Sequence, residues 1–518
     1  MKYAVTSQEM KICDRNTSEH FGISTEVLME RASLAIADEI DSWKKSRSAD
    51  RKYSVLVLAG VGNNGGDGIC AGRLLSQRDY DVTICVIGDV AKCSELMLRQ
   101  MGIAENYGLT RDTFSNIRDN TRASDFDIII DAMFGIGLSR ALMGDALEAV
   151  DFVEQCKKER DKDLFVISVD IPSGINADNG RVCGAAIRAD RTVTFNFPKL
   201  GHLLYPGCEY AGELVVRDVG ITADSFLDKT PGFVYYDGEP SALLPERRRD
   251  GNKGSNGKVL IVAGSRDISG ACILAASAAL RTGAGMVRIF TAVENAEAVK
   301  TLLPEALLDT YEDFEPIEDK LEDACRWSTQ AVIGPGIGTA GKGSELVGAM
   351  LRDYDKSLVM DADALNLIAG DPDLYKLAQN YCTGGKRLIL TPHVGEFARL
   401  YKTDIRDVKE HLTEYPKELA KRMHATVICK DARSMVADGN ERVSYINVSG
   451  NDGMATAGSG DVLSGILGAL LTYDITGFEV ACAGTYIHGR AGDEAADRLG
   501  RYAVAATDIV AAISEVLH

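Results

Sequence analysis

One pattern recurs along most of this chain: a short run rich in Val, Ile and Leu, then a glycine-containing turn, then a helical stretch. Continuous apolar strands that alternate with helices are typical of a parallel β-sheet covered by helices on both faces. In such α/β folds, ligands bind outside the carboxyl ends of the strands. We therefore predict an α/β protein whose functional residues lie in the strand-to-helix turns. The strand runs span residues 53–60, 81–88, 126–133 and 164–170, and later 258–264, 287–291, 331–334, 357–361, 388–391 and 426–429.

The length of 518 residues predicts two or three domains. Residues 221–245 carry three of the twelve prolines and no clear hydrophobic period, which is typical of a linker. We predict domains at residues 1–220 and 246–518, joined by that segment. Helices expected at 7–17 and 24–42 precede the first strand, so they pack on the sheet or in a subunit interface.

Charge and composition exclude several function classes. The net charge of −19 offers no basic face for nucleic acid or for an anionic membrane. No run approaches the ~18 apolar residues of a membrane helix, and the first residues lack a signal-peptide core. Twelve cysteines without a CxxC pair are typical of a reducing cytoplasm, and seven histidines without HxxxH spacing argue against a zinc enzyme. We expect a cytoplasmic protein with small-molecule substrates.

The first glycine cluster is GVGNNGGDG at residues 60–68, directly after a strand. It formally matches GxGxxG, which alone is a weak dinucleotide signal, and it can also be a tight strand–helix turn. Two asparagines and Asp67 within the glycines favour a ligand site, because their oxygens are hard donors and glycine lets the backbone approach a ligand.

Two further strand ends point to the same edge of the sheet. Asp131 ends one strand and precedes FGIGLSR, and Asp170 ends the next and precedes Pro-Ser-Gly. The oxygens of Asn64, Asp131 and Ser173 form a set that suits a monovalent cation better than zinc. Taken singly, each acid is also compatible with a helix cap or turn. Lys199, after another strand, is a candidate to bind an anion or transfer a proton.

The strongest segment is GNDGMATAGSGDVLSG at residues 450–465. Backbone N–H groups at a helix N-terminus bind anions, so AGSGD can stabilise a transferring phosphoryl group. Asp461 can take a proton from a substrate hydroxyl, although an ordinary helix N-cap is the simpler alternative. Residues 336–342, GIGTAGK, have P-loop spacing, but Gly343 occupies the required Ser/Thr position.

Together these motifs resemble the bifunctional NAD(P)H-hydrate repair enzymes over nearly the whole chain. GNNGGDG, DAMFGIG, VDIPSG and FPKLG resemble the epimerase half, and GPGIG, MDADALN, TPHVGEF and NDGMATAGSGDVLSG resemble the dehydratase half. The resemblance implies a Rossmann-like three-layer αβα domain followed by a ribokinase-like α/β domain. It also implies epimerisation of R- and S-NAD(P)HX, and dehydration of the S form to NAD(P)H at the expense of ADP or ATP with Mg²⁺.

The resemblance assigns residues to these activities. In the first domain it implies K⁺ at Asn64, Asp131 and Ser173, catalysis by Asp170 and Lys199, and hydrate contacts from Asn63, Asn64, Gly65, Gly66, Asp67, Gly135, Ile136, Gly137, Leu138, Ser139, Arg140, Ala141 and Asp170. In the second it implies catalysis by Asp461, and hydrate contacts from Ala271, Gly336, Gly338, His393 and Asp461. The nucleotide would contact Lys430, Asp431, Ala432, Arg433, Ser434, Asn451, Met454, Thr456, Gly458, Ser459 and Gly460.

Other functions share some of these motifs. A ribokinase-like vitamin-precursor kinase fused to a nucleotide-binding domain would also contain GSGD, but it would release a stable phosphorylated product. A nucleotide sensor would bind the hydrate without changing the R/S ratio, and a dehydrogenase would transfer hydride. We expect a homo-oligomer such as a tetramer.

Overall fold

The computed structural model describes residues 1–47, 51–160, 163–247, 249–382 and 385–518. The chain divides into two compact units, Tyr3–Gly232 and Phe233–His518, the second of which also includes Met1–Lys2. The segment 221–245, expected to be a linker, contributes to both units. It contains the short helix η5 (Ala223–Phe226) in the first unit, and strand β9 (Phe233–Tyr235) in the second.

The first unit is built on a seven-stranded sheet within the described residues, and all of its strand pairs are parallel. The strand order, from one edge to the other, is β4 (Thr110–Asp112), β3 (Tyr80–Ile87), β2 (Tyr53–Gly60), β5 (Ile128–Ala132), β6 (Phe165–Val169), β7 (Arg191–Phe195) and β8 (Glu213–Arg217). Its helices are α1 (Ser7–Glu19), α2 (Thr25–Lys45), α3 (Asn63–Ser76), α4 (Glu95–Asn106), α5 (Phe114–Asn120), α6 (Asp145–Arg160) and α7 (Leu200–Leu203).

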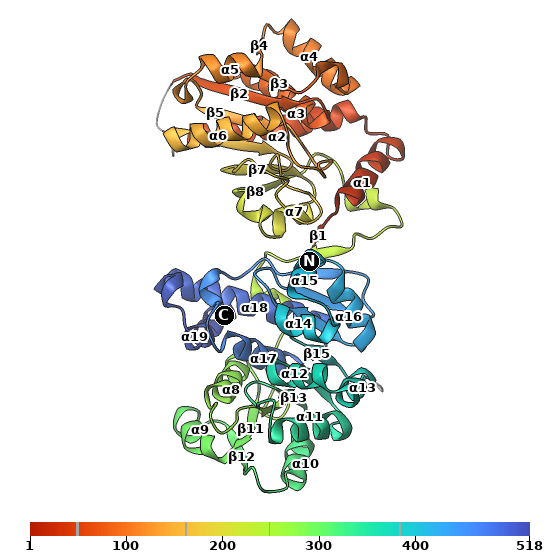
Figure 1. Cartoon of the computed structure of the whole chain (residues 1–518), viewed down its shortest axis with the longest axis vertical. Coiled ribbons are helices and arrows are strands. Elements are labelled where there is room, and N and C mark those ends of the chain that lie inside the picture. The colour runs from red at the N-terminus through yellow and green to blue at the C-terminus, as the bar shows by residue number, and fades with distance from the viewer. Residues whose placement is uncertain (48–50, 161–162, 248, 383–384) are drawn as a thin grey trace. The chain divides into compact units, whose positions relative to one another are not determined.

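Helices cover both faces of this sheet, as the continuous apolar strands predict (Figure 1). Alternate residues of one strand belong to different cores, because successive side chains point to opposite faces. Val55 and Val57 join the core formed with α2, α3 and α4, whereas Leu56 and Leu58 join the core formed with α5 and α6. The fold is therefore a three-layer αβα arrangement.

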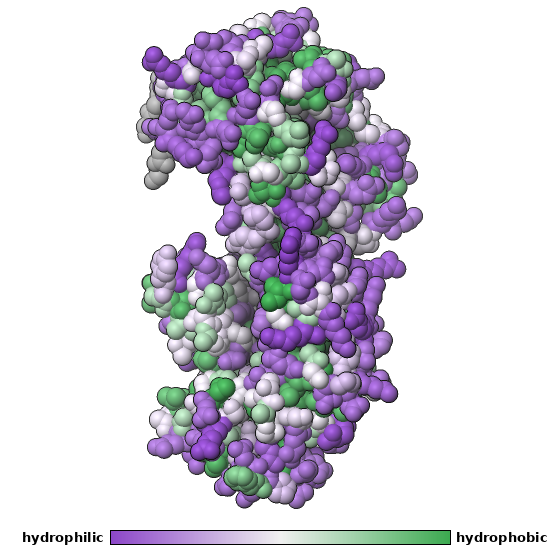
Figure 2. Space-filling view, viewed as in Figure 1, coloured by the Kyte–Doolittle hydropathy of each residue, from purple (hydrophilic) through white to green (hydrophobic). Residues whose placement is uncertain are grey.

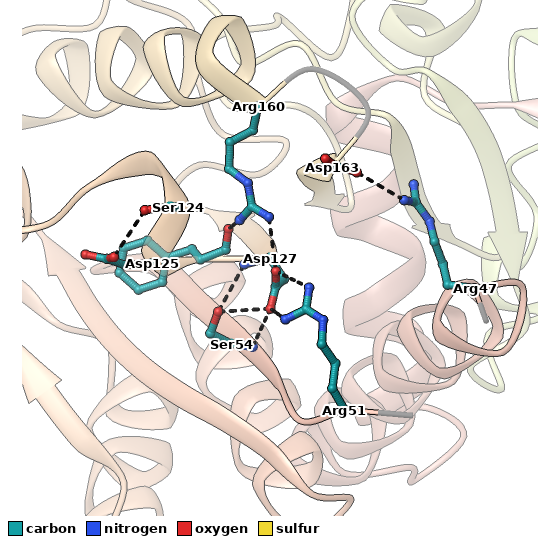
Figure 3. A network of polar contacts seen from close by, with 9 residues as sticks. Arg47, Arg51, Ser54, Ser124, Asp125, Asp127, Arg160 and Asp163 are labelled. Atoms are coloured by element: carbon teal, nitrogen blue, oxygen red, sulfur yellow. Dashed lines mark hydrogen bonds and ion pairs between the residues drawn. The ribbon is translucent and has the colours of Figure 1, made fainter. Parts of the chain in front are cut away.

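A charged cluster lies at the amino-terminal edge of the same sheet (Figure 3). Asp127, just before β5, is buried and accepts hydrogen bonds from Arg51 at 2.7 and 2.8 Å and from Arg160 at 3.2 Å. The backbone N–H of Ser54 donates to the same carboxylate. Burial alone would raise the pKa of Asp127, but the Arg51 and Ser54 hydrogen bonds hold it below its usual value. None of the predicted site residues lies in this cluster at the amino-terminal edge of the sheet.

The second unit contains an eleven-stranded sheet within the described residues. Its order is β1 (Lys2–Ala4), β9, β18 (Ser444–Ile446), β17 (Met435–Asp438), β16 (Thr426–Cys429), β15 (Leu388–Leu390), β14 (Ser357–Met360), β13 (Gln330–Ile333), β10 (Lys258–Val262), β11 (Met286–Ala292) and β12 (Leu307–Tyr311). The strands from β16 through β12 pair in parallel. An antiparallel hairpin of β16, β17 and β18 extends the sheet, which the uniform parallel expectation missed.

Helices also cover this sheet (Figure 1). They are α8 (Gly270–Thr282), α9 (Ala296–Leu302), α10 (Glu318–Trp327), α11 (Lys342–Asp353), α12 (Ala362–Gly370), α13 (Pro372–Asn380), α14 (Val394–Tyr401), α15 (Ile405–Glu410), α16 (Tyr415–Met423), α17 (Ser459–Leu470), α18 (Gly477–Leu499) and α19 (Ala506–Val516). Among the described residues, no helix combines the length and the apolar character needed to cross a membrane. The visible surface is mostly hydrophilic (Figure 2).

Candidate functional sites

The first candidate site lies at the carboxyl ends of β2, β5 and β6, where helix α3 begins. Asn63 to Asp67 form the first five residues of α3, whose N-cap Gly62 makes no side-chain hydrogen bond to the helix. A Cβ at Gly65 would lie only 1.8 Å from the carbonyl oxygen of Gly60, so glycine is required for α3 to pack this closely on β2. The N–H groups of the first turn are left to bind an anion.

Asp131 is the penultimate residue of β5 and is fully buried. Its carboxylate accepts hydrogen bonds from the hydroxyl of Ser168 at 2.7 Å and from the backbone N–H of Ser173 at 2.8 Å. Burial raises the pKa of Asp131, and these hydrogen bonds offset only part of that effect. Within the described part of the chain, Asp131 forms no ion pair, unlike Asp127 at the other edge.

The other two predicted cation ligands lie around the loop that follows β5. The Nδ2 of Asn64 is buried without a hydrogen-bond partner among the described residues, and the Asn64 side chain abuts Gly135. The hydroxyl of Ser173 accepts a hydrogen bond from Phe134 N–H at 2.9 Å. A buried, unpaired carboxylate beside amide and hydroxyl groups fits a monovalent cation. No cluster of three or more His, Cys, Asp or Glu side chains in the described ranges could hold a metal ion.

The loop that follows β5 also contains the other predicted hydrate contacts. Ile136 packs against the apolar core and Leu138 is buried, whereas Ser139, Arg140 and Ala141 are exposed. The sequence therefore alternates residues that anchor this loop with residues that face outward.

A buried ion pair lies at the ends of β6 and β7. The Nζ of Lys199 lies 2.5 Å from a carboxylate oxygen of Asp170, and both Lys199 and Asp170 also hydrogen-bond to the hydroxyl of Thr194. Lys199 is 1% exposed, although a lysine next to proline and glycine is more often at the surface. Asp170 has a left-handed backbone, with φ of 65°.

Three more titratable residues, Asp67, Asp14 and His202, interact electrostatically with this pair. Burial, together with Asp170 and Asp14, raises the pKa of Asp67 well above its usual value. Burial raises the pKa of Asp14, on α1, to about 6, despite the opposing effect of Lys199. Sequence reasoning missed Asp14, because no motif lies on α1, and it missed His202, although that residue directly follows the FPKLG motif.

The second candidate site lies around the N-terminus of α17. This helix begins at Ser459, within the AGSGD segment, so Asp461 lies in its first turn. The N-cap Gly458 has φ of 88°, a left-handed conformation that favours glycine, and provides no side-chain cap. The first N–H groups are thus available to an anion, which favours the anion-hole interpretation.

A lysine–aspartate pair, in which Asp361 is buried and Lys430 is partly exposed, lies beside this helix end. Lys430 donates to Asp361 at 2.8 Å, and Ser464 donates to the other carboxylate oxygen of Asp361 at 2.7 Å. Burial alone would raise the pKa of Asp361, but Lys430 holds it below its usual value. Burial and Asp361 raise the pKa of Asp461 to about 6, while Lys430 opposes this effect.

His393 is the N-cap of α14, and its Nδ1 accepts a hydrogen bond from Gly395 N–H at 2.9 Å. Glu396 caps the backbone N–H of His393 at 2.9 Å, and burial raises the pKa of this carboxyl to about 7. The backbone N–H of Lys430 donates to the carbonyl of Pro392, so the β15 and β16 loops meet here. Sequence reasoning named the loop TPHVGEF but not Glu396 itself.

The three other residues predicted to contact the hydrate in the second unit are Ala271, Gly336 and Gly338. A Cβ at Gly336 would lie 3.0 Å from the Cβ of Ala271, at the start of α8, so these two positions are in contact. The N–H of Gly338 donates to Asp363 on α12 at 2.9 Å. The loop after β13 therefore contacts the start of α8 and the start of α12.

The predicted nucleotide residues fall in two loops. Residues 430–434 connect β16 to β17, and Arg433 donates to the carbonyl of Val448. Asn451 begins the short helix η9 (Asp452–Met454) and donates to Asp493 of α18 at 2.9 Å. The hydroxyl of Ser459, at the start of α17, lies 3.3 Å from the Nε2 of His488, a second residue that the sequence did not reveal. The remaining members, Thr456, Gly458 and Gly460, lead into or begin α17.

Two protein-family models match this chain. One, described as the YjeF-related protein N-terminus, matches residues 25–201, and the other, described as NAD(P)H-hydrate dehydratase, matches residues 259–515. A bifunctional NAD(P)H-hydrate repair enzyme from Thermofilum pendens is 35% identical over 512 residues, covering 97% of this chain and 93% of that protein. The corresponding Escherichia coli protein is 32% identical, covering 98% and 92%.

Solved structures resemble the second unit. An ADP/ATP-dependent NAD(P)H-hydrate dehydratase from Bacillus subtilis, crystallised with ATP and Mg²⁺, is 26% identical, with a TM-score of 0.46, and covers 54% of this chain and 94% of its own. A ribokinase-like superfamily protein from Enterococcus faecalis is 25% identical, with a TM-score of 0.48, and covers 56% and 96%.

Proposed function

Because this chain belongs to the family of bifunctional NAD(P)H-hydrate repair enzymes, we propose how its two sites divide the repair reaction. The protein interconverts R- and S-NAD(P)HX and dehydrates the S form to NAD(P)H at the expense of ADP or ATP. We assign epimerisation to the site between α3 and the ends of β5 and β6, and dehydration to the site at α17. The observation that supports this division is that each sheet has its own lysine–aspartate ion pair at its carboxyl edge.

In the first site, the start of α3 would hold the anionic part of the hydrate through its N–H groups. Asp170 and Lys199 would carry the proton transfers at the reacting carbon, while Asn63 to Asp67 and residues 135–141 contact the substrate. Asn64, Asp131 and Ser173 would hold K⁺, which supplies a fixed positive charge when bound. The buried carboxylate of Asp131, which forms no ion pair among the described residues, supports this cation.

In the second site, Asp461 would act as the general base that removes the proton from the C6 hydroxyl of the S hydrate. Its pKa of about 6 leaves it mostly ionised at neutral pH. The N–H groups of α17 would stabilise the phosphoryl group as it moves from ADP or ATP to that hydroxyl. Phosphate then leaves with the hydroxyl oxygen, and loss of the C5 proton restores NAD(P)H. We propose Ala271, Gly336, Gly338 and His393 as hydrate contacts, and the two loops described above as the site of the Mg²⁺ nucleotide.

We further propose that the protein acts in the cytoplasm as a homo-oligomer. The twelve cysteines without a CxxC pair are typical of a reducing compartment, which supports this location.

The test follows reduced-nicotinamide absorbance from a mixture of R and S hydrates with ADP or ATP. If both activities are present, absorbance recovers completely, because epimerisation feeds the S form. Recovery of the S fraction alone would contradict the epimerase assignment. Release of a stable phosphorylated product instead of inorganic phosphate would indicate a kinase.

A further inference from the structure

A histidine lies buried behind the lysine–aspartate pair of the first unit. His202 belongs to α7, is 3% exposed, and follows Lys199 by three residues. Its Nδ1 accepts a hydrogen bond from the backbone N–H of Lys199 at 3.0 Å. The backbone N–H of His202 donates to the carbonyl of Lys199, also at 3.0 Å. Two hydrogen bonds therefore join His202 to the backbone of the paired lysine.

The hydrogen bond to Nδ1 determines the tautomer of this imidazole. Because Nδ1 accepts a hydrogen bond from the backbone N–H of Lys199, the ring proton lies on Nε2. Burial and the adjacent Lys199 ammonium lower the pKa of His202 to about 3, so the ring is neutral at physiological pH. It adds no second positive charge next to Asp170.

The Nε2 atom makes no hydrogen bond of normal geometry with the described residues, although it is fully buried. A buried unsatisfied donor is costly, which is unusual unless the group has a role. The backbone of Asp170 is close enough to favour the protonated ring, so this donor lies beside the segment that carries the carboxylate.

Asp170 itself needs support from its surroundings. Its φ of 65° is uncommon for a residue with a side chain, and such a conformation persists only when neighbouring contacts enforce it. The N–H of Asp170 donates to the carbonyl of Val193 at 2.8 Å, which fixes one side of the residue. His202 contacts the segment that contains Lys199, through the two hydrogen bonds described above.

The simpler role of His202 is that of a helix cap. It occupies the position of α7 where Gln or Glu usually completes a capping box with the N-cap residue, here Lys199. α7 has only four residues, so the cap does little for helix stability, but it does fix the direction of the chain at Lys199.

We propose that His202 is a positioning residue of the epimerase site, whose neutral imidazole holds Lys199 and Asp170 in register for proton transfer. This inference rests on the proposed epimerase function of the first unit. It predicts that His202 affects the rate of the reaction more than substrate binding, because it contacts the backbone of the reacting groups and not the hydrate.

The experiment compares three variants in the full-length enzyme. His202→Leu removes both ring nitrogens, and His202→Asn keeps an acceptor near the position of Nδ1 but has no donor at the position of Nε2. Both should lower kcat for R/S interconversion by about 10–100-fold with KM within about twofold, since small misplacements of reacting groups have effects of this size. His202→Gln can accept from Lys199 and still donate toward Asp170, so it should restore most of kcat.

Dehydration of pure S hydrate by the same samples is the internal control, and it should match the wild type in all three variants. Wild-type kcat in His202→Asn, or a loss in His202→Gln as large as in His202→Asn, overturns the positioning role, whether or not His202→Leu folds. A parallel rise in KM instead of a fall in kcat also overturns it. If the wild-type enzyme itself does not interconvert the hydrates, the proposed function fails instead.

Discussion

The two sites share one arrangement and differ in how they use it. Each contains a lysine that pairs with one aspartate, the buried Lys199 with Asp170 and the partly exposed Lys430 with the buried Asp361. Each also has a second aspartate nearby whose pKa is raised by burial, Asp67 in the first unit and Asp461 in the second. Because the lysine is already paired, the second carboxyl group is left to exchange a proton.

The surroundings of the second aspartate differ between the units. Asp461 lies in the first turn of α17, and Lys430 counteracts part of its pKa rise, which leaves the pKa at about 6. Asp67 is the fifth residue of α3, and its neighbours Asp170 and Asp14 add to the effect of burial. The comparison indicates that Asp461 is suited to accept a proton at neutral pH, whereas Asp67 is suited to donate one.

The largest expected effect is that of Asp461→Asn. This change keeps the size of the side chain but removes the base, which typically lowers a rate by ~10²–10⁴-fold. Nucleotide-dependent recovery of NADH from S hydrate should fall by that order, while epimerisation continues at the wild-type rate. Calorimetry with ADP and ATP should show little change in affinity. Near-normal turnover would show that Asp461 is not the base and simply lies at the N-terminal end of α17.

Asp131→Ala, in the first unit, should cause a smaller loss of activity than Asp461→Asn causes in the second. Removal of a carboxylate from a cation site should lower epimerisation by about 10–100-fold, the range measured when groups that support a metal site are replaced. The R/S ratio should be followed over time at several K⁺ concentrations, because the variant should need more K⁺ than the wild type. Dehydration of S hydrate is the control; if it falls together with epimerisation in a folded variant, the cation site has been assigned to the wrong unit.

The pH dependence of the two activities should separate the two aspartates. Protonation of Asp461 below its pKa of about 6 removes the base, so kcat for dehydration should be about tenfold below its plateau near pH 5. The rate should rise with pH through this range and then level off. Epimerisation, measured in the same buffers, should not follow that curve. A dehydration rate that is flat from pH 5 to 8 would contradict the base role.

The smallest effect is expected when the units are separated. A fragment of residues 1–232 contains the whole first sheet and its two cores, so it should fold and epimerise within about twofold of the intact chain. The shorter fragment 1–225 would lose Phe226, which belongs to one of those cores, and should be less stable. Thermal unfolding followed by circular dichroism, alongside the R/S assay, distinguishes the two fragments; an unfolded 1–232 fragment would refute independent folding.

Much of the fold was predictable because its strands are buried on both faces. The runs 53–60 and 426–429 match β2 and β16 at both ends, since each is continuously apolar and followed by a turn. The strands that were missed have weaker patterns. β8 is partly exposed, and β9, β17 and β18 are three or four residues long, so neither length nor period distinguishes them from loops.

The sequence predicted which loops carry the site residues, but not which side chains pair within the sites. Motifs located Asp170, Lys199, Asp361 and Lys430 after strands, because the strand order brings such turns to one edge. The pairing of Asp361 with Lys430, 69 residues apart, depends on the order of strands across the sheet, which the sequence does not state. Asp14 comes from a helix with no motif and His202 follows the FPKLG motif, and the effect of both arises from burial, a property of the folded chain alone.

The way α17 presents its N-terminus has a consequence for the kinetics of encounter. The nearby cations are already engaged, since Lys430 pairs with Asp361 and Arg433 donates to Val448, so the helix end attracts a nucleotide through short-range peptide dipoles. At longer range, a protein of net charge −19 repels an anionic nucleotide. Dissolved salt screens repulsion beyond about 8–10 Å but hardly weakens contacts inside the site. Added salt should therefore speed nucleotide association, the reverse of what enzymes with cationic clefts show.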